Sequence, residues 1–204
     1  CLGRQHREVH PRLLACEVRG QWRRYLMTLK IRLAKAREAL RDEAGIGRSL
    51  FDDLLDQYPD ARVDILRERS LGYAELGEFG SAFADRRSVA EADAAGLGDL
   101  YFAGEYALQA GDLAQAALYF DQCIERSSSE RGTYYLSSAR LLAALCRACL
   151  GDRVAALALL QEVPDDTSVM WLEGFDDQIT KASVLTRLSR EATSPRGAGG
   201  LPVA

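Results

Sequence analysis

A short turn motif, a Gly followed by an acidic residue, recurs along the 204-residue chain and constrains its fold more than any other feature. The copies that follow an apolar helical segment at repeat spacing are Gly77-Glu78, Gly111-Asp112 and Gly151-Asp152. The first two copies are 34 residues apart, and the third follows after 40 because the polar segment 127–132 adds length. A repeat of this period predicts stacked helical hairpins, since one hairpin cannot bury its own apolar stripe and must pack against the next.

The residues around each turn have helical periodicity. In segment 112–127, small and apolar side chains recur at helical spacing: Leu113, Ala116, Ala117, Phe120, Cys123 and Ile124. A Gly tolerates the left-handed conformation that ends many helices, and Asp112 can cap the amides of the helix that follows. Ala and Leu dominate the apolar residues and only 8% of the chain is aromatic. This composition favours closely packed helices over sheets.

The expected fold class is therefore all-α, an α-solenoid of stacked antiparallel helix pairs. The helix pairs are expected at about 28–61, 63–96, 97–130 and 137–166, followed by a capping helix at about 168–190. The apolar face of that capping helix is expected to carry Leu172, Phe175, Ile179, Ala182, Leu185 and Leu188. The first pair is expected to turn at Ala44-Gly45-Ile46-Gly47.

Two flanking segments are separated from the repeat domain, which is expected to span residues 27–192. Residues 1–26 are rich in Arg and are interpreted as a capping helix that starts at Pro11 or as a non-native extension. Residues 193–204 are rich in Pro and Gly and are expected to form a disordered tail. The start at Cys1 has three interpretations: an acylated bacterial lipoprotein, a domain excised from a larger protein, or a natural start at Met27.

A helical pair of this length, with a turn Gly, small residues and an aromatic residue in its second helix, resembles the tetratricopeptide repeat. The resemblance covers roughly two-thirds of the chain. It is clearest in 97–130, through Gly104, Ala107, Gly111, Ala116 and Phe120. The bulky Trp of the family pattern is absent from every pair, and Arg86 stands at the aromatic site of the second pair.

The resemblance implies that the first helix of each pair lines a concave groove for an extended or helical peptide. The expected groove residues are Arg32, Ala36, Arg67, Leu71, Tyr101, Glu105, Leu108, Gln109, Ser138, Leu141 and Leu145. The Lys and Asn residues of the family's carboxylate clamp for chaperone tails do not occur among them. This set favours an apolar or amphipathic ligand segment with polar anchors at Arg67 and Glu105.

Charge and hydropathy exclude two classes of protein. The net charge is −4, although residues 1–26 hold six Arg against two Glu, so the remainder is acidic. An acidic body argues against nucleic-acid binding, which needs a concentrated basic face. No apolar run approaches the ~20 residues that span a bilayer. The basic segment 1–26 is interpreted as a solvated face, with contact to an acidic partner as the alternative.

Residues that could support catalysis or metal binding have simpler structural interpretations. Cys146 and Cys149 lie among Leu and Ala, which indicates apolar packing. Four metal-type ligands, Cys1, His6, His10 and Cys16, fall within sixteen residues, but Pro11 interrupts their geometry. The glycines of 45–49 lack the Lys-Ser/Thr of a phosphate loop and are assigned to a turn. The acidic pairs Asp52-Asp53, Asp165-Asp166 and Asp176-Asp177 are assigned to surface charge and helix starts. No catalytic residue, metal site or cofactor is expected.

The expected function is that of a non-catalytic interaction module, a scaffold or adaptor that binds a peptide or helix of a protein partner. The alternatives are a sensory or regulatory arm of a larger bacterial regulator and a lipid-anchored envelope assembly factor. An Arg-rich, Lys-poor, Ala-rich composition is associated with GC-rich bacterial genomes. The expected location is the cytoplasm, or the bacterial envelope if Cys1 carries a lipid. A homo-oligomer is left open.

Overall fold

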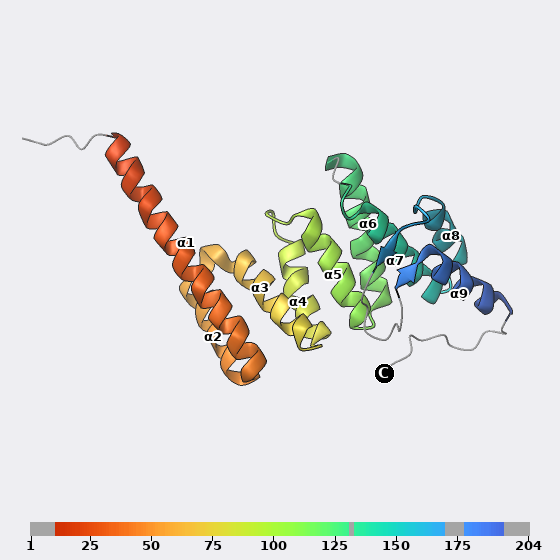
Figure 1. Ribbon diagram of the computed structural model, residues 1–204, viewed down its shortest axis with the longest axis horizontal. Coiled ribbons are helices and arrows are strands. Elements are labelled where there is room, and N and C mark those ends of the chain that lie inside the picture. Colours follow the sequence, from red (N-terminus) through yellow and green to blue (C-terminus); the bar gives the residue numbers. More distant parts are fainter. Residues whose placement is uncertain (1–10, 131–132, 170–177, 194–204) are drawn as a thin grey trace, which may run out of the picture. The chain divides into compact units, whose positions relative to one another are not determined.

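The computed structural model describes residues 11–130, 133–169 and 178–193, with side chains described in 25–128, 133–169 and 178–190. These residues form nine α-helices, one 3-10 turn and one pair of two-residue strands, so the expected all-α fold is confirmed (Figure 1). The chain divides into two compact units, Cys1–Pro59 and Asp60–Ala204, and each unit is described by itself.

The first unit is a helical hairpin of α1 (Pro11–Asp42) and α2 (Ala44–Gln57), linked by Glu43 alone. Its core comprises Leu29, Leu33, Ala36 and Leu40 from α1 and Phe51 and Leu54 from α2. Helix α1 begins at Pro11, where a proline's fixed φ suits the first turn, and it continues past residue 26 without a break. The expected boundary between 1–26 and the repeat domain is therefore wrong, because no helix-terminating residue follows Leu26.

The expected turn at residues 44–47 is also wrong, because all four residues lie in the first turn of α2. A Cβ atom at Gly47 would lie 2.2 Å from the Cα of Leu40, so only a glycine lets the two helix backbones approach this closely. At Gly45 a Cβ would meet nothing within 4 Å. The glycine signal in this segment thus reflects a close contact between helices and not the turn itself.

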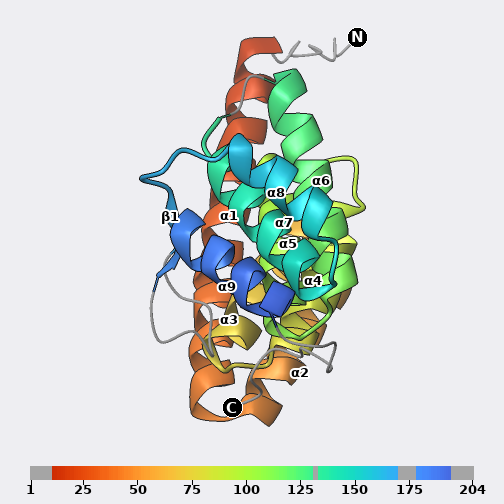
Figure 2. The same ribbon diagram turned by 90° about the vertical axis from the view of Figure 1, so that its right-hand side faces the viewer.

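The second unit is a series of helical hairpins, α3–α4, α5–α6 and α7–α8, in which consecutive helices are packed neighbours (Figure 1). The helices are α3 (Arg62–Glu75), α4 (Phe79–Ala90), α5 (Leu97–Gln109), α6 (Leu113–Glu130), α7 (Leu136–Cys149) and α8 (Arg153–Gln161). A 3-10 turn, Pro59–Ala61, precedes α3. Figure 2 views this series from the side of its last helices.

The recurrent Gly-acid motif forms the turn of each hairpin in the second unit. Gly77, Gly111 and Gly151 have φ values of 71°, 82° and 81°, in the left-handed region. In all three turns the amide after the glycine donates to the carbonyl five residues earlier at 2.9 Å, which is the bonding of a Schellman helix end. The Asp112 and Asp152 carboxylates each accept an amide of the next helix at 3.1 Å. The predicted turn chemistry is confirmed.

The C-terminal helix begins later than expected. Ser168–Val169 (β1) pairs antiparallel with Ile179–Thr180 (β2), and α9 spans Lys181–Thr193. Thr180 and Ser183 explain the start of α9, because the Thr180 amide donates to the Ser183 hydroxyl at 3.0 Å and the Ser183 amide donates to the Thr180 hydroxyl at 3.2 Å. A capping helix starting at 168 is therefore wrong, and Ile179 belongs to a strand.

Helix α9 packs against α7 and α8, so it does cover the last hairpin. Its buried residues are Val184 and Leu188, whereas Ala182 and Leu185 are exposed. The buried face of α9 is thus rotated about the helix axis relative to the expected apolar face. Leu172 and Phe175 lie outside the described residues, as does the predicted tail except Thr193, which ends α9.

The core of the second unit is most continuous from α5 to α9. Its largest fully buried side chains include Phe120, Leu141, Leu142, Leu145 and Leu160. A Cβ atom at Gly104 on α5 would lie 2.8 Å from the Phe120 ring on α6, so the glycine makes room for that ring. Here an absent side chain lets two helices pack closely, as small residues at helix contacts commonly do.

Candidate binding site on the first helices

The expected groove residues do not form one set in the structure. Arg32 belongs to the first unit, where its guanidinium donates to the Gln57 side chain at 2.6 Å and to the Tyr58 hydroxyl at 3.0 Å. It also lies 5.4 Å from the centroid of the Tyr58 ring. Arg32 therefore connects the middle of α1 to the end of α2. Ala36 also lies on α1, and the other expected residues lie on α3, α5 and α7 of the second unit.

Five of the expected groove residues belong to the core of their unit. Leu108, Leu141 and Leu145 are at most 2% exposed, and Tyr101 is 7% exposed. Ala36 of the first unit is fully buried as well. These assignments to an open groove are wrong, because α5 and α7 each pack against the helices before and after them. Leu71, Glu105, Gln109 and Ser138 are half-buried, so each retains some accessible surface.

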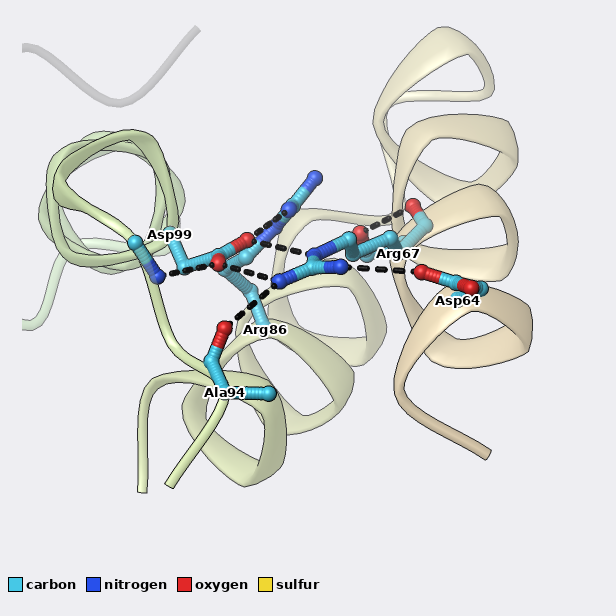
Figure 3. Close-up of polar contacts among 7 residues, drawn as sticks. Asp64, Arg67, Arg86, Ala94 and Asp99 are labelled. Atoms are coloured by element: carbon cyan, nitrogen blue, oxygen red, sulfur yellow. Dashed lines mark hydrogen bonds and ion pairs between the residues drawn. The ribbon is translucent and has the colours of Figure 1, made fainter. Parts of the chain in front are cut away.

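Asp99, near the start of α5, is the centre of a polar cluster (Figure 3). Its two oxygens accept hydrogen bonds from the Arg67 Nε and Nη2 atoms at 2.9 and 2.7 Å. They also accept from Arg86 Nη1 at 2.9 Å and from the Gly96 amide at 2.8 Å. Although burial alone would raise the pKa of Asp99, these bonds and the two positive charges hold it below its usual value.

Arg67 links three segments of the second unit. Besides Asp99, its guanidinium donates to Asp64 on α3 at 2.9 Å and to the Ala94 carbonyl at 3.2 Å (Figure 3). The hydrogen bond to Asp99 is the largest cause of its raised pKa. Arg67 was expected to anchor a ligand, but its donors are engaged within the protein. Its hydrogen bonds connect α3 to the segment before α5 and to α5 itself.

Arg86 on α4 lies 34 residues before Phe120, at a position where the sequence led us to expect an aromatic residue. It is 4% exposed, and its guanidinium lies 5.3 and 5.8 Å from the centroids of the Phe102 and Tyr106 rings of α5. Its Nη1 bonds Asp99, while its buried Nε has no hydrogen-bond partner among the described residues. The sequence marked Arg86 as a departure from the pattern, but the long-range Asp99 contact could not be found from local spacing.

Glu105 is the half-buried carboxylate of this cluster. Burial raises its pKa to about 7, and the charge of Arg86 opposes that rise. No described residue donates a hydrogen bond to Glu105 or forms an ion pair with it. Burial and the negative charge of Glu105 raise the pKa of Tyr101, one helical turn earlier on α5. Glu105 is therefore an expected groove residue whose carboxylate oxygens accept no hydrogen bond from a described residue.

Two tyrosines at the start of α7 extend the cluster and were missed from the sequence. The Tyr135 ring stacks on Tyr101 with centroids 4.8 Å apart and an angle of 29° between the planes. Tyr134 contacts Tyr135 edge-on, also at 4.8 Å, and is 87% exposed. The Tyr-Tyr pair directly before a helix was the available signal. The rings of Tyr101, Tyr135 and Tyr134 thus connect α5 to the start of α7.

The described residues that could support catalysis or metal binding lie in surroundings typical of structural residues. Cys146 is buried and its pKa is raised by that burial, which keeps the thiol protonated. Within the described residues, no group of three His, Cys, Asp or Glu side chains could hold a metal ion. The side chains of Cys1, His6, His10, Cys16, Asp176 and Asp177 lie outside those that the structure describes. Asp165 is exposed and pairs with Lys181 at 2.8 Å.

In the described part of the chain, no helix has both the length and the hydropathy to cross a membrane. Comparison of the chain with protein-family models, with curated proteins and with solved structures finds no match.

Proposed function

We propose that this chain is a non-catalytic interaction module of the tetratricopeptide type. Its second unit would bind an extended or helical segment of a partner protein on the side of the first helices, α3, α5 and α7. The support lies in three successive hairpins with the same glycine turn, in which Leu71, Gln109 and Ser138 of the first helices retain accessible surface. Repeats of this kind commonly use their continuous surface to bind extended partners.

The observation that carries the proposal is Glu105. A half-buried carboxylate commonly accepts hydrogen bonds from the protein, because an acceptor that loses water without gaining a donor destabilises the fold. Glu105 has no such donor among the described residues, and it lies one helical turn after Tyr101, whose ring stacks on Tyr135. A partner segment would supply the missing donor and cover the exposed Tyr134 ring.

The proposal places the chain in a reducing compartment such as the cytoplasm. Cys123, Cys146 and Cys149 are free thiols in the structure. Free, buried cysteines are common in proteins of reducing compartments and less so in secreted domains, where disulfides persist.

Site-specific photo-crosslinking in cells of the source organism tests this function. A photoreactive amino acid at Leu71 or Tyr134 should capture a protein partner, since both residues belong to the proposed binding side. The same amino acid at Leu118 on α6 or Val154 on α8 serves as control, because these residues are 46% and 82% exposed on second helices. Crosslinks from the control positions alone would contradict the proposal.

A further inference from the structure

Helix α1 is more than twice as long as its hairpin partner, since α1 has 32 residues and α2 has 14. The end of α2 lies beside the middle of α1. There Gln57 accepts a hydrogen bond from Arg32 at 2.6 Å, and the Tyr58 ring is edge-on to Tyr25 with centroids 5.4 Å apart. Residues 11–24 of α1 therefore continue past the end of α2 for about 20 Å (Figure 1).

The face of α1 that packs on α2 also continues past α2. Its buried residues are spaced by four, three and four along the helix: Leu29, Leu33, Ala36 and Leu40. The same spacing, counted backwards, places further apolar residues on this face: Leu26, Trp22, Val18 and Ala15. The exposed fraction rises from 3% at Leu29 to 48% at Leu26, where α2 ends. In the described part of the first unit, α2 is the only helix that packs against α1, so this apolar face has no helix beside it before Leu26.

A row of basic positions runs beside the apolar face of α1. Arg19, Arg23 and Lys30 each follow a residue of that face by one position, which places them about 100° around the helix from it. Over its whole length, α1 holds nine Arg or Lys residues against three acidic residues. The part of α1 beyond α2 therefore combines an apolar stripe with a row of positive charges along one edge.

The helix that already packs on this face shows which partner chemistry fits it. Helix α2 contributes Phe51 and Leu54 to the shared core, and its charged residues are three Asp and one Arg. It is thus an amphipathic helix of negative net charge, opposite in sign to α1. A second copy of α1 would instead bring another set of basic residues to the same surface, where like charges repel.

We propose that residues 15–26 of α1 bind an acidic amphipathic helix of a partner protein. This surface belongs to the first unit, so the inference goes beyond the binding function proposed for the second unit and does not depend on it. The apolar side chains of the partner helix pack on the stripe in the same way as those of α2. Its carboxylates lie along the row that contains Arg19 and Arg23, which gives the contact its charge specificity.

Selection from a phage-displayed library of helical peptides, made on the full chain, tests the inference. The peptides carry fixed apolar residues at heptad spacing and random residues beside them. Peptides enriched on the native chain should have a negative net charge. Trp22→Asp places a charge in the apolar stripe and should weaken their binding about tenfold, or more.

Met27→Asp is the matched control for this selection. It introduces the same charge at a position about 140° around the helix from Trp22, and Met27 is 63% exposed. The enriched peptides should therefore bind this variant as they bind the native chain. If Met27→Asp weakens binding as much as Trp22→Asp does, the loss comes from the added charge alone and the inference fails.

An exchange of charges separates a direct contact from an effect on the folding of α1. The double variant Arg19→Glu, Arg23→Glu should bind the acidic peptides about tenfold more weakly than the native chain. Peptides in which Lys replaces the acidic residues should bind this double variant more tightly than they bind the native chain. Failure of the Lys peptides to recover binding would overturn the inference.

Other occupants of the apolar face would give different results, and each of these would overturn the inference. Enriched peptides that bind Trp22→Asp as tightly as the native chain use another surface. A chain that is dimeric by light scattering, and monomeric as Trp22→Asp, uses this face for a second copy. Cosedimentation with phosphatidylserine vesicles that Trp22→Asp abolishes would assign the face to a membrane. If no peptide is enriched, the inference fails, whereas crosslinking at Leu71 and Tyr134 still decides the proposed function.

Discussion

Two seams between successive hairpins of the second unit have opposite chemistry. Between α5–α6 and α7 the seam is apolar, because Phe120 is fully buried in the same core cluster as Leu141 and Leu142 of α7. Within its own hairpin the Phe120 ring is edge-on to Tyr101 at 5.9 Å. Between α3–α4 and α5 the seam is ionic, because Arg86 stands 34 residues before Phe120, at the matching position of the repeat. Arg86 is 4% exposed, so nearly the same degree of burial is reached with a charge as with a ring.

The comparison shows that the stacking of the hairpins does not depend on whether apolar or charged side chains lie between them. Both hairpins end their first helix with the same glycine turn, and both stack on the following helix. An apolar seam stabilises the fold by removing surface from water. A buried ionic seam contributes little net free energy compared with apolar packing, but it becomes strongly unfavourable when one partner is lost. We therefore expect the ionic seam to tolerate replacement of both charged partners, but not the loss of only one of them.

Truncation of a side chain in the apolar seam should lower the free energy of unfolding more than any other change proposed here. Phe120→Ala removes a fully buried ring that Gly104 accommodates, so we expect a loss of about 4 kcal/mol from the free energy of unfolding. Urea denaturation followed by circular dichroism measures it. Leu118→Ala is the control on the same helix, because Leu118 is 46% exposed and its truncation should cost less than about 0.5 kcal/mol. Similar losses in both variants would refute the assignment of this seam.

The ionic seam should break when its central carboxylate is neutralised. Asp99→Asn leaves the buried guanidinium of Arg86 without its counter-charge, and we expect a loss of about 3 kcal/mol in urea denaturation. Adding Arg86→Met should restore much of that stability, since an apolar side chain replaces the stranded charge. Asp64→Asn removes a mostly exposed partner of Arg67 and should cost less than about 0.5 kcal/mol. A double variant no more stable than Asp99→Asn would show that Arg86 does not depend on Asp99.

The ionic seam should also make stability depend on pH through Glu105. The folded-state pKa of about 7 lies above the usual 4.5, so the protonated form is favoured by folding. This contribution is fully present below pH 4.5 and is lost as the pH rises through about 7. Asp99 acts in the opposite sense at lower pH, because its pKa is lowered and its contribution is lost in acid.

Glu105→Gln should remove the decline in stability that accompanies the rise in pH towards 7. At pH 8 the variant should be more stable than the native chain by about 2 kcal/mol, because the half-buried charge is gone. Thermal unfolding between pH 5 and pH 8 measures the difference, with Glu125→Gln as the matched control because Glu125 is an exposed glutamate on α6. A native chain and a Glu105→Gln variant with parallel pH profiles would show that Glu105 is not withdrawn from water.

The candidate site was predictable in part. Glu105 and Arg67 were selected from their place on the first helices, and both lie in the polar cluster around Asp99. Leu108, Leu141 and Leu145 were selected by the same rule and are buried. A position on a helix face indicates which side chains can lie together, but not how closely the next helix covers them. The Tyr134–Tyr135 pair was missed because its partner, Tyr101, lies on another helix.

The sequence by itself determined the features that depend on near neighbours in the chain. Glycine turns at 77, 111 and 151, the caps at Asp112 and Asp152, and the helical periodicity all act within a few residues, so local propensity suffices to predict them. The tertiary structure alone decided that Gly47 marks a helix contact, that Arg86 is buried against Asp99, and that α9 begins at Lys181. Each of these depends on groups that local spacing does not reveal, because packing and burial set the conformation and charge of a residue through whatever the fold places beside it.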